Sequence, residues 1–424
     1  MKTTALRIHG KNDLRLDAFD LPEPGEDEIL AEVVTNSVCM SDHKAAVQGP
    51  EHKRVPKDVA TNPTIIGHEF AGFIRRVGQQ WAGRFKPGQK FSIQPALGYK
   101  GSLDAPGYSF RTIGGDASFI IVPSCVMEMD CLLAYDGEGF FKASLSEPLS
   151  CIIGAAHAQY HTRYGSYQHV MGIVEGGTCA LLAAAGPMGL GCVDYLVHGP
   201  RKPKLLVVTD IDQARLDRAA RLMTVADAAR HGVQLAYLNT ARGSSDPVAA
   251  LRGLTGGNGY DDVFVFAPVA PVLEQADAML GRNGCLNFFA GPTKPEFSAR
   301  FNFYNVHYAE THLVGTSGGN TDDMREALQL MSENRINPAA MITHIGGITS
   351  AKETIMKLPD IPGGKKLIYT HYDLPLVAIE DFSKAGQTNP MFMNLAEICS
   401  RYEGLWNVEA EDCLLKSAPK HVLP

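Results

Sequence analysis

The stretch Thr178-Cys179-Ala180-Leu181-Leu182-Ala183-Ala184-Ala185-Gly186-Pro187-Met188-Gly189 determines the architecture of this chain. Residues 178–185 form a continuous apolar run, the glycines after it mark a turn, and Leu190–His198 follows as an apolar helix. Strands that are apolar without interruption are typical of parallel sheets covered by helices on both faces. The stretch therefore predicts the start of a doubly wound α/β fold.

Strands and helices continue to alternate after this stretch. Further strands are predicted at Leu205–Asp210, Val233–Leu238, Asp262–Ala267, Gly284–Phe289 and Thr311–Gly315. Helices are predicted at Asp212–Met223, near Asp246–Leu254, at Leu273–Leu280 and at Asp322–Asn334. This order indicates a parallel sheet, after which the chain returns to the first domain.

The first hundred residues have a different pattern of short β-branched runs between turns. Strands are predicted at Thr3–Ile8, Glu28–Thr35, Thr64–Val77 and Lys90–Gln94. Turns are indicated by Pro22-Glu23-Pro24-Gly25 and Lys86-Pro87-Gly88. This region predicts a partly open β-barrel, and a length of 424 residues is sufficient for two domains.

The composition excludes several classes of protein. A content of 45% apolar and 20% charged residues is that of a globular protein, and a net charge of −7 argues against a nucleic-acid partner. No secretory signal and no membrane-spanning segment is evident. Nine scattered cysteines without a CxxC pair favour reduced thiols and a cytoplasmic location.

Three short motifs carry residues that together could bind a metal ion. Cys39 begins Cys39-Met40-Ser41-Asp42-His43, His68 lies in Gly67-His68-Glu69, and Glu147 lies in Leu145-Ser146-Glu147-Pro148-Leu149-Ser150. A thiolate, an imidazole and a carboxylate are the three protein ligands of a catalytic zinc, whose fourth position stays open. Taken singly each residue is weak evidence, but the three motifs together predict a zinc site.

These motifs and the turn at residues 186–189 resemble those of the medium-chain zinc-dependent dehydrogenases, and of their polyol branch in particular. The resemblance extends from about Ile8 to about Tyr369. It implies a GroES-like β-barrel catalytic domain at 1–170 and 335–424, a Rossmann domain at 171–334, and a homodimer or homotetramer joined through the nucleotide domains. Residues 159–177 look like an insertion, and the tail beyond Tyr369 has no assignment.

The resemblance also implies the zinc ligands. Cys39 and His68 are two of them, and the third is either Glu147, which stands where the alcohol-dehydrogenase branch has a cysteine, or Glu69. In the polyol branch the residue at Glu69 binds zinc or lies just behind it. We expect Glu147 in the resting enzyme, with Glu69 able to exchange in. Residues 92–124 contain no cysteine, so a single catalytic zinc and no structural zinc is expected.

The residues after Cys39 have more than one interpretation. Ser41 could direct its hydroxyl at the reacting oxygen and begin a proton path, or cap the following helix. Asp42 could cap that helix or bond the His68 ring. The branch usually has a relay histidine one place after His43, where this chain has Lys44, so the relay role of His43 is doubtful. Lys44 could replace it, hold a substrate phosphate, or be solvated.

Residues 184–189 resemble the dinucleotide fingerprint, with alanine in place of its first glycine. The turn Gly186-Pro187-Met188-Gly189 would receive the cofactor's pyrophosphate at the start of the helix. Asp210, 21 residues beyond Gly189, would bond the adenine-ribose hydroxyls and favours NAD(H) over NADP(H). A nearby Arg215 could instead accommodate a 2′-phosphate.

The resemblance implies a reductase that interconverts a ketose phosphate and a polyol phosphate. Gly318 and Gly319 suggest a pocket with room for the phosphate. The cations that could hold it are Lys44, Lys53, Arg54, Lys57, Lys100 and Arg111, and the sequence does not show which of them converge. A dehydrogenase of free polyols or other secondary alcohols, and a catalytically idle nucleotide-binding relative, are the alternatives.

Overall fold

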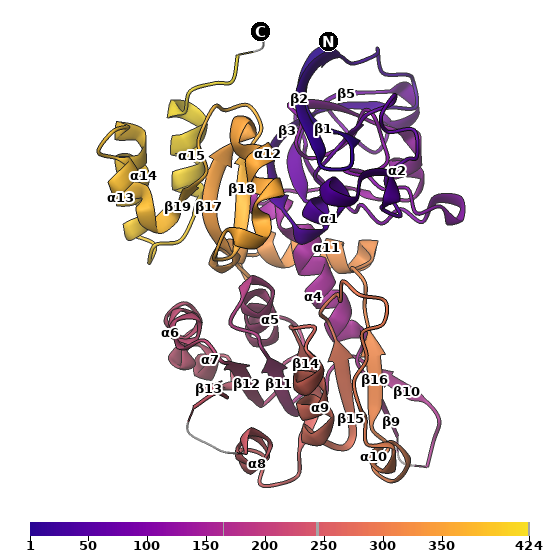
Figure 1. Cartoon of the computed structure of the whole chain (residues 1–424), viewed down its shortest axis with the longest axis vertical. Coiled ribbons are helices and arrows are strands. Elements are labelled where there is room, and N and C mark those ends of the chain that lie inside the picture. Colours follow the sequence, from indigo (N-terminus) through magenta and orange to yellow (C-terminus); the bar gives the residue numbers. More distant parts are fainter. Residues whose placement is uncertain (164, 243–245, 423–424) are drawn as a thin grey trace. The chain divides into compact units, whose positions relative to one another are not determined.

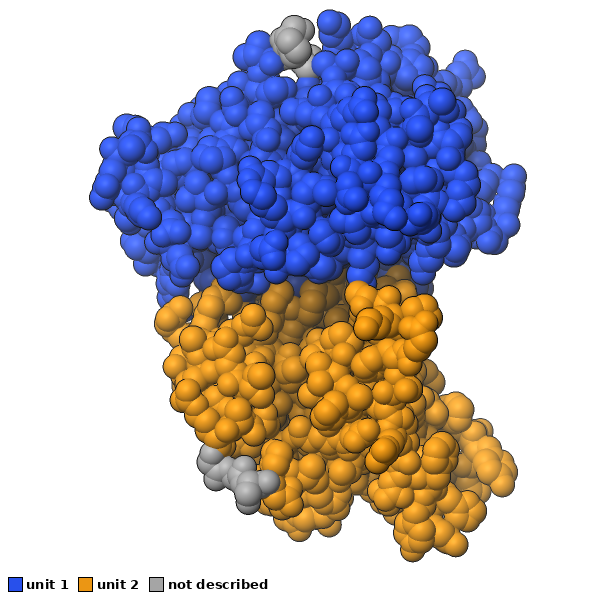
Figure 2. All heavy atoms as spheres, viewed as in Figure 1, with its two compact units in different colours: residues 1–147, 320–333, 338–424 blue, residues 148–319, 334–337 orange. Residues whose placement is uncertain are grey.

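The computed structural model describes residues 1–163, 165–242 and 246–422. The chain forms two compact units, which Figure 2 distinguishes by colour. Unit 1 comprises residues 1–147, 320–333 and 338–424, and unit 2 comprises residues 148–319 and 334–337. These limits differ from the domain ranges expected from the sequence, 1–170 with 335–424 and 171–334, which remain a prediction.

Unit 2 is built on a six-stranded parallel sheet with the order β13-β12-β11-β14-β15-β16. Its strands are β11 (Thr178–Leu182), β12 (Leu205–Asp210), β13 (Gln234–Asn239), β14 (Tyr260–Val265), β15 (Leu280–Phe288) and β16 (His312–Gly315). Its helices are α5 (Pro187–His198), α6 (Gln213–Leu222), α7 (Val225–Arg230), α8 (Pro247–Gly253), α9 (Ala270–Met279) and α10 (Phe303–Tyr308). Figure 1 shows these strands side by side with helices packed along them. The predicted doubly wound fold is confirmed.

The core of this sheet follows from its sequence. Val207, Val263 and Val265 are fully buried, as a strand covered on both faces requires. The structure adds α7 and α10, which the sequence did not predict, and a short hairpin of β9 (Tyr160–Thr162) and β10 (His169–Met171) in the segment expected to be an insertion.

Unit 1 contains two sheets. The smaller has the order β2-β1-β4, and the larger has the order β19-β17-β18-β3-β5-β6-β8, with β7 paired to β3. The strands from the first part of the chain are β1 (Lys2–Gly10), β2 (Asp13–Asp20), β3 (Ile29–Val38), β4 (Thr64–Ile65), β5 (Phe70–Val77), β6 (Lys90–Ile93), β7 (Phe119–Val122) and β8 (Leu132–Ala134). The four strands predicted in this region are confirmed, although the strand predicted at 64–77 is divided into β4 and β5. The described strands do not close into a complete barrel.

Short helices connect these strands and return the chain to unit 1. They are α1 (Met40–Gln48), α2 (Ser124–Glu128), α3 (Phe140–Ser144), α4 (Ser146–Ala158), which continues into unit 2, α11 (Thr321–Ser332) and α12 (Ile348–Met356). Short 3₁₀ segments lie at Gly49–Glu51, Gln79–Trp81, Tyr99–Gly101, Pro338–Met341, Leu358–Asp360 and Ile379–Asp381. No helix in the described part of the chain is both long and apolar enough to span a membrane.

The tail beyond Tyr369 is part of the core of unit 1. Two strands precede it, β17 (Ile342–Gly347) and β18 (Lys365–Tyr369). The tail itself contains strand β19 (Val377–Ala378) and helices α13 (Phe382–Ala385), α14 (Pro390–Ser400) and α15 (Val408–Ser417). Trp406 is fully buried and donates from Nε1 to the Tyr369 hydroxyl at 2.8 Å. That hydroxyl donates in turn to Oε1 of buried Glu411 at 2.7 Å. The tail is therefore fixed to β18 by a buried polar network as well as by apolar packing.

Candidate functional site

Cys39 lies at the junction between β3 and α1, in unit 1. Its backbone N–H donates to Oδ2 of Asp42 at 2.9 Å, which caps the start of α1. Its Sγ lies 3.1 Å from the hydroxyl oxygen of Ser41. The strand end and the helix cap therefore fix the thiol together with the serine that follows it.

His68 and Glu69 lie in the turn between β4 and β5. Gly67 has φ +96°, and a Cβ there would lie 2.7 Å from Nδ2 of Asn36, so the turn requires glycine. The carbonyl of Glu69 accepts a hydrogen bond from the N–H of Ser37 at 2.8 Å, which ties this turn to β3. The Gly-His-Glu motif is thereby placed beside Cys39.

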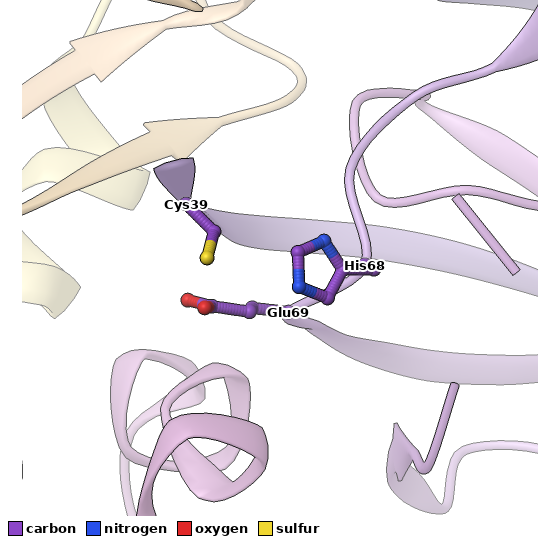
Figure 3. Close-up of side chains that lie close together, drawn as sticks. All are labelled: Cys39, His68 and Glu69. Carbon is purple, nitrogen blue, oxygen red and sulfur yellow. The ribbon is translucent and has the colours of Figure 1, made fainter. Parts of the chain in front are cut away.

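The structure brings Cys39, His68 and Glu69 together, as Figure 3 shows. A sulfur, an imidazole nitrogen and a carboxylate oxygen of these residues all lie within 4.8 Å of one another. Ligands bound to one zinc ion at about 2.0–2.3 Å can lie at most about 4.6 Å apart. The donor types and their spacing therefore fit zinc, with only a small closing movement.

Asp42 fixes the His68 ring. Its Oδ1 lies 2.7 Å from Nδ1 of His68, while its other oxygen caps α1, so both interpretations of Asp42 are confirmed. Burial disfavours the charged imidazole, but Asp42 and Cys39 outweigh it and raise the pKa of His68 well above its usual value. A carboxylate on Nδ1 leaves Nε2 as the nitrogen for a metal, as in carboxylate–histidine–zinc sites.

Glu69 has a buried cationic partner. Both of its carboxylate oxygens lie near Nζ of Lys365, at 2.5 and 2.7 Å, and both side chains are almost fully buried. Burial opposes the charge of Lys365, but the charges of Glu69 and Cys39 outweigh it and raise its pKa. No sequence motif indicated Lys365, because its position beside Glu69 depends on the pairing of β18 with β3.

Glu147, the expected third ligand, is not a member of the three-residue group. It is half-buried in the first turn of α4, and its charge contributes to raising the pKa of Lys365. Glu147 therefore acts electrostatically on the partner of Glu69. Glu69 is thus the carboxylate grouped with Cys39 and His68, and the role of Glu147 as the ligand of the resting enzyme stays a prediction.

The remaining residues near Cys39 have separate positions. Nδ1 of His43 lies 2.9 Å from the carbonyl oxygen of Ile355 on α12, so this ring packs against a helix. Lys44 is half-buried on α1. This contact does not support a role for His43 in a proton relay, which the sequence analysis had already doubted.

Tyr108 is a site residue that the sequence analysis missed. Its hydroxyl lies 2.9 Å from Nδ1 of His68, and the two rings are in contact at a centroid distance of 5.0 Å. Gly107 has φ +82°, and a Cβ there would lie 2.1 Å from the carbonyl oxygen of Gly67. This close approach brings Tyr108 to His68, and only the glycine before the tyrosine could have indicated it.

The predicted cofactor turn lies in unit 2 between β11 and α5. A Cβ on Gly189 would lie 1.9 Å from the carbonyl oxygen of Ala184, so helix and strand pack too closely for any side chain. A Cβ on Gly186 would meet nothing within 4 Å, so space is open beside this residue. Pro187 starts the helix, and the N–H groups of Met188 and Gly189 have no carbonyl partner within it. The turn fits a pyrophosphate.

Asp210 lies at the end of β12 and supports the turn. Its Oδ2 accepts a hydrogen bond from the N–H of Ala185 at 3.1 Å, and its Oδ1 accepts one from Ile211 at 2.8 Å. Arg215 lies on α6, 3.6 Å from Asp212, and both side chains are largely exposed. The acid expected at the ribose is therefore fixed by backbone donors, whereas Arg215 has an acidic partner of its own.

Comparison with known proteins identifies the family. Residues 25–129 match the alcohol dehydrogenase GroES-like domain, and residues 205–333 match the zinc-binding dehydrogenase family. The chain is 52% identical over 415 residues to mannitol-1-phosphate 5-dehydrogenase from Aliivibrio fischeri, covering 98% of each chain. It belongs to the zinc-dependent medium-chain dehydrogenases, in their polyol branch.

Two further comparisons are consistent with this membership. The dehydrogenase chain is 49% identical over 416 residues to L-sorbose 1-phosphate reductase from Klebsiella pneumoniae, again covering 98% of each chain. The solved structure of 2R,3R-butanediol dehydrogenase from Bacillus subtilis superposes with a TM-score of 0.68 at 20% identity, covering 87% of this chain and 99% of the other. The latter likeness concerns the fold alone.

Proposed function

We propose that this dehydrogenase uses zinc and NAD(H) to interconvert a ketose phosphate and a polyol phosphate. The observation that carries the proposal is the grouping of Cys39, His68 and Glu69 within 4.8 Å, in a chain whose relatives are zinc-binding dehydrogenases. L-sorbose 1-phosphate, reduced to D-glucitol 6-phosphate, is the first candidate substrate. The name of the Klebsiella pneumoniae relative supports it.

A second candidate substrate pair is favoured by the Aliivibrio fischeri relative. Its name specifies mannitol 1-phosphate and oxidation at carbon 5, which corresponds to D-fructose 6-phosphate as the ketose. The two candidates share a six-carbon chain, one phosphate and a secondary alcohol. They differ in how far the phosphate lies from the reacting carbon, so kinetics on both would distinguish them.

Cys39, His68 and Glu69 would hold the zinc, with Glu147 able to exchange for Glu69. When bound, zinc would act as a Lewis acid on the carbonyl group, and the nicotinamide would supply the hydride. Asp42 fixes the His68 ring through Nδ1 and so sets which nitrogen faces the metal. Lys365 offsets the negative charge of Glu69 inside the protein.

Reduction of the ketone needs a proton at the oxygen as well as a hydride at the carbon. Ser41 is the residue proposed to move it, because its hydroxyl lies 3.1 Å from the Cys39 sulfur and the residue is partly exposed. The Tyr108 hydroxyl lies 2.9 Å from Nδ1 of His68, and burial raises the pKa of this phenol well above its usual value. The tyrosine therefore stays protonated, and Ser41 is left as the residue that would connect the ligand group to solvent.

The preference for NAD(H) rests on Asp210. Backbone donors fix this carboxylate at the end of β12, where it would accept hydrogen bonds from ribose hydroxyls and repel a 2′-phosphate. Arg215, which could have accommodated that phosphate, lies beside Asp212.

One assay tests the function. Oxidation of NADH by the purified protein would be followed with L-sorbose 1-phosphate, D-fructose 6-phosphate and the two free ketoses, before and after removal of zinc. We expect turnover of at least one ketose phosphate, much slower turnover of both free ketoses, and loss of activity without zinc that zinc restores. Equal turnover of free and phosphorylated ketoses would indicate a dehydrogenase of free polyols. Full activity in zinc-free protein would refute the metal mechanism.

A further inference from the structure

Of the six cations that the sequence offered for a phosphate, three converge around His52. Burial and, in decreasing order, the positive charges of Arg54, Lys53 and Lys44 lower the pKa of His52 to about 4, against the opposing charge of Asp42. Lys44 and Arg54 are half-buried and Lys53 is exposed. Three cations thus act on one imidazole, which is neutral at physiological pH.

Over the described ranges of the chain, these cations are not paired with acidic side chains, although the charge of Asp42 also reaches His52. Among the residues that the structure describes, none of Lys44, Lys53 and Arg54 forms an ion pair with a carboxylate. The Nε of Arg54 is buried and has no hydrogen-bond partner in the described part of the chain. Uncompensated positive charge of this kind repels itself, and an anion would relieve the repulsion and satisfy the buried N–H.

The other cations are engaged elsewhere. Nζ of Lys57 donates to the carbonyl of Pro50, and Nζ of Lys100 lies 4.8 Å from the ring centroid of Tyr99. Burial lowers the pKa of Arg7, and the charge of Arg111 adds a smaller effect in the same direction, so Arg111 acts near Arg7. The convergence at His52 is therefore selective, and the sequence alone could not have distinguished these six residues.

Tyr108 connects the cations to the ligand group. The guanidinium carbon of Arg54 lies 5.4 Å from the centroid of its ring, and the His52 ring is stacked on it at 5.7 Å. On the metal side the same tyrosine contacts His68 at 5.0 Å. Two successive ring contacts therefore separate the cations from His68, a separation that suits a phosphate at the far end of a six-carbon chain, as in D-fructose 6-phosphate, rather than one on the carbon next to the carbonyl, as in L-sorbose 1-phosphate. All of these residues belong to unit 1.

We propose that Lys44, Lys53 and Arg54 form the phosphate subsite of this dehydrogenase, with Tyr108 as the wall between the phosphate and the reacting carbonyl. The inference rests on the proposed function and specifies how a phosphorylated ketose is distinguished from a free one. The fork of Arg54 suits two phosphate oxygens at once, and the lysines add point charges.

His52 completes the subsite as a neutral donor. Its Nδ1 accepts a hydrogen bond from the N–H of Arg54 at 3.3 Å, so the ring proton of the neutral form is on Nε2. That N–H is available to a phosphate oxygen, and the bond to Arg54 holds the ring beside the three cations.

Kinetics on matched substrates test the subsite. Arg54→Gln and Lys44→Gln should each raise KM for the ketose phosphate by roughly 10- to 100-fold, the effect of losing one charge-assisted contact. KM for the corresponding free ketose should change less than about twofold. Lys57→Gln, a neighbouring cation outside the subsite, is the control and should leave both values unchanged. Equal increases for free and phosphorylated ketoses, or no increase for either, would overturn the proposal.

Equilibrium binding separates this proposal from the proposed function. Calorimetric titration of the zinc-loaded full-length protein with inorganic phosphate should show binding that Arg54→Gln weakens about tenfold or more, that Arg54→Lys partly retains and that Lys57→Gln leaves intact. Such a result would support the subsite even if no ketose phosphate were reduced. Phosphate binding that is absent in the wild type, or equally strong in Arg54→Gln, would refute it, provided that thermal unfolding shows both proteins folded.

Discussion

Nζ of Lys365 lies 2.5 and 2.7 Å from the two carboxylate oxygens of Glu69, inside the group that would hold zinc. Both side chains are buried, so each charge depends on the other for compensation. A zinc ion beside Glu69 would be a second source of positive charge for the same carboxylate. A bound zinc ion and the ion pair would therefore be coupled energetically.

This coupling predicts the behaviour of Lys365→Met. Removing one partner of a buried ion pair costs about 3–5 kcal/mol, so we expect the zinc-free variant to lose free energy of unfolding on that order. Added zinc should stabilise the variant more than the wild type, because the metal replaces the missing cation. Denaturant unfolding with and without zinc measures both quantities, and Lys365→Arg, which keeps the charge, is the control. Equal stabilisation by zinc in all three proteins would contradict the coupling.

Zinc retention distinguishes the two candidate carboxylate ligands. Glu69→Gln should weaken zinc binding more than about 100-fold, whereas Glu147→Gln should weaken it by about 10- to 100-fold, the usual effect of a group behind the ligands. The reason is that Glu69, and not Glu147, is grouped with Cys39 and His68. Zinc content after dialysis against graded chelator measures this order. If Glu147→Gln loses zinc first, the ligand expected from the sequence is the correct one.

We expect the cofactor preference to depend on Asp210 and Arg215. We expect kcat/KM for NADH to exceed that for NADPH in the wild type, and Asp210→Asn to reduce this ratio by about tenfold, because the charge that repels the 2′-phosphate is lost. Arg215→Gln should raise the ratio or leave it unchanged. Since Asp210 also accepts backbone hydrogen bonds, thermal unfolding of each variant is measured in parallel. A wild type that prefers NADPH would refute the assignment.

The sequence predicted the sheet of unit 2 well because its strands are apolar throughout, and a strand buried on both faces needs little information from elsewhere. β12 was predicted with its observed limits, Leu205–Asp210, and its acid was placed at the strand end. The tail was not predicted, because Trp406 and Glu411 acquire their roles only through Tyr369, on a strand about 40 residues earlier.

That Cys39 and His68 lie together could be predicted for a similar reason. Cys39 and His68 lie in motifs that are local in sequence, whereas the choice between Glu69 and Glu147 depends on distances that no motif contains. Tyr108 reaches His68 only because Gly107 and Gly67 pack together. Lys44, Lys53 and Arg54 could be named from the sequence, but their convergence required the structure.

The expected homodimer or homotetramer can be tested at the edge of the unit 2 sheet. β16 ends this sheet, and Leu313 on it is 52% exposed, while Phe303 and Tyr304 on α10 are 76% and 68% exposed. An edge strand beside exposed apolar side chains is open to pairing, and we propose a second copy of the chain as its partner. Sedimentation equilibrium should show at least a dimer, and Leu313→Lys should shift it toward monomer. A monomeric wild type would refute this interface.

We expect Glu411 to make the stability of unit 1 dependent on pH. Burial raises its pKa to about 7, although the Tyr369 hydroxyl and the N–H groups of Phe140 and Phe141 favour the charged form. A glutamate in the unfolded chain titrates near about 4.3. Between these two pH values the folded protein binds a proton that the unfolded chain has released, so this group lowers the free energy of unfolding as the pH rises.

Glu411→Gln should remove this contribution, because an amide cannot ionise. Relative to the wild type, the variant should gain up to about 3 kcal/mol of unfolding free energy between pH 4.5 and pH 7.5, with little further change at higher pH. Denaturant unfolding across this range measures the difference, and Glu397→Gln, an exposed residue on the neighbouring α14, is the control that should show no such trend. A difference between Glu411→Gln and the wild type that stays constant with pH would show that Glu411 is already ionised at the acid end, and that its contacts with α3 and Tyr369 hold a carboxylate throughout.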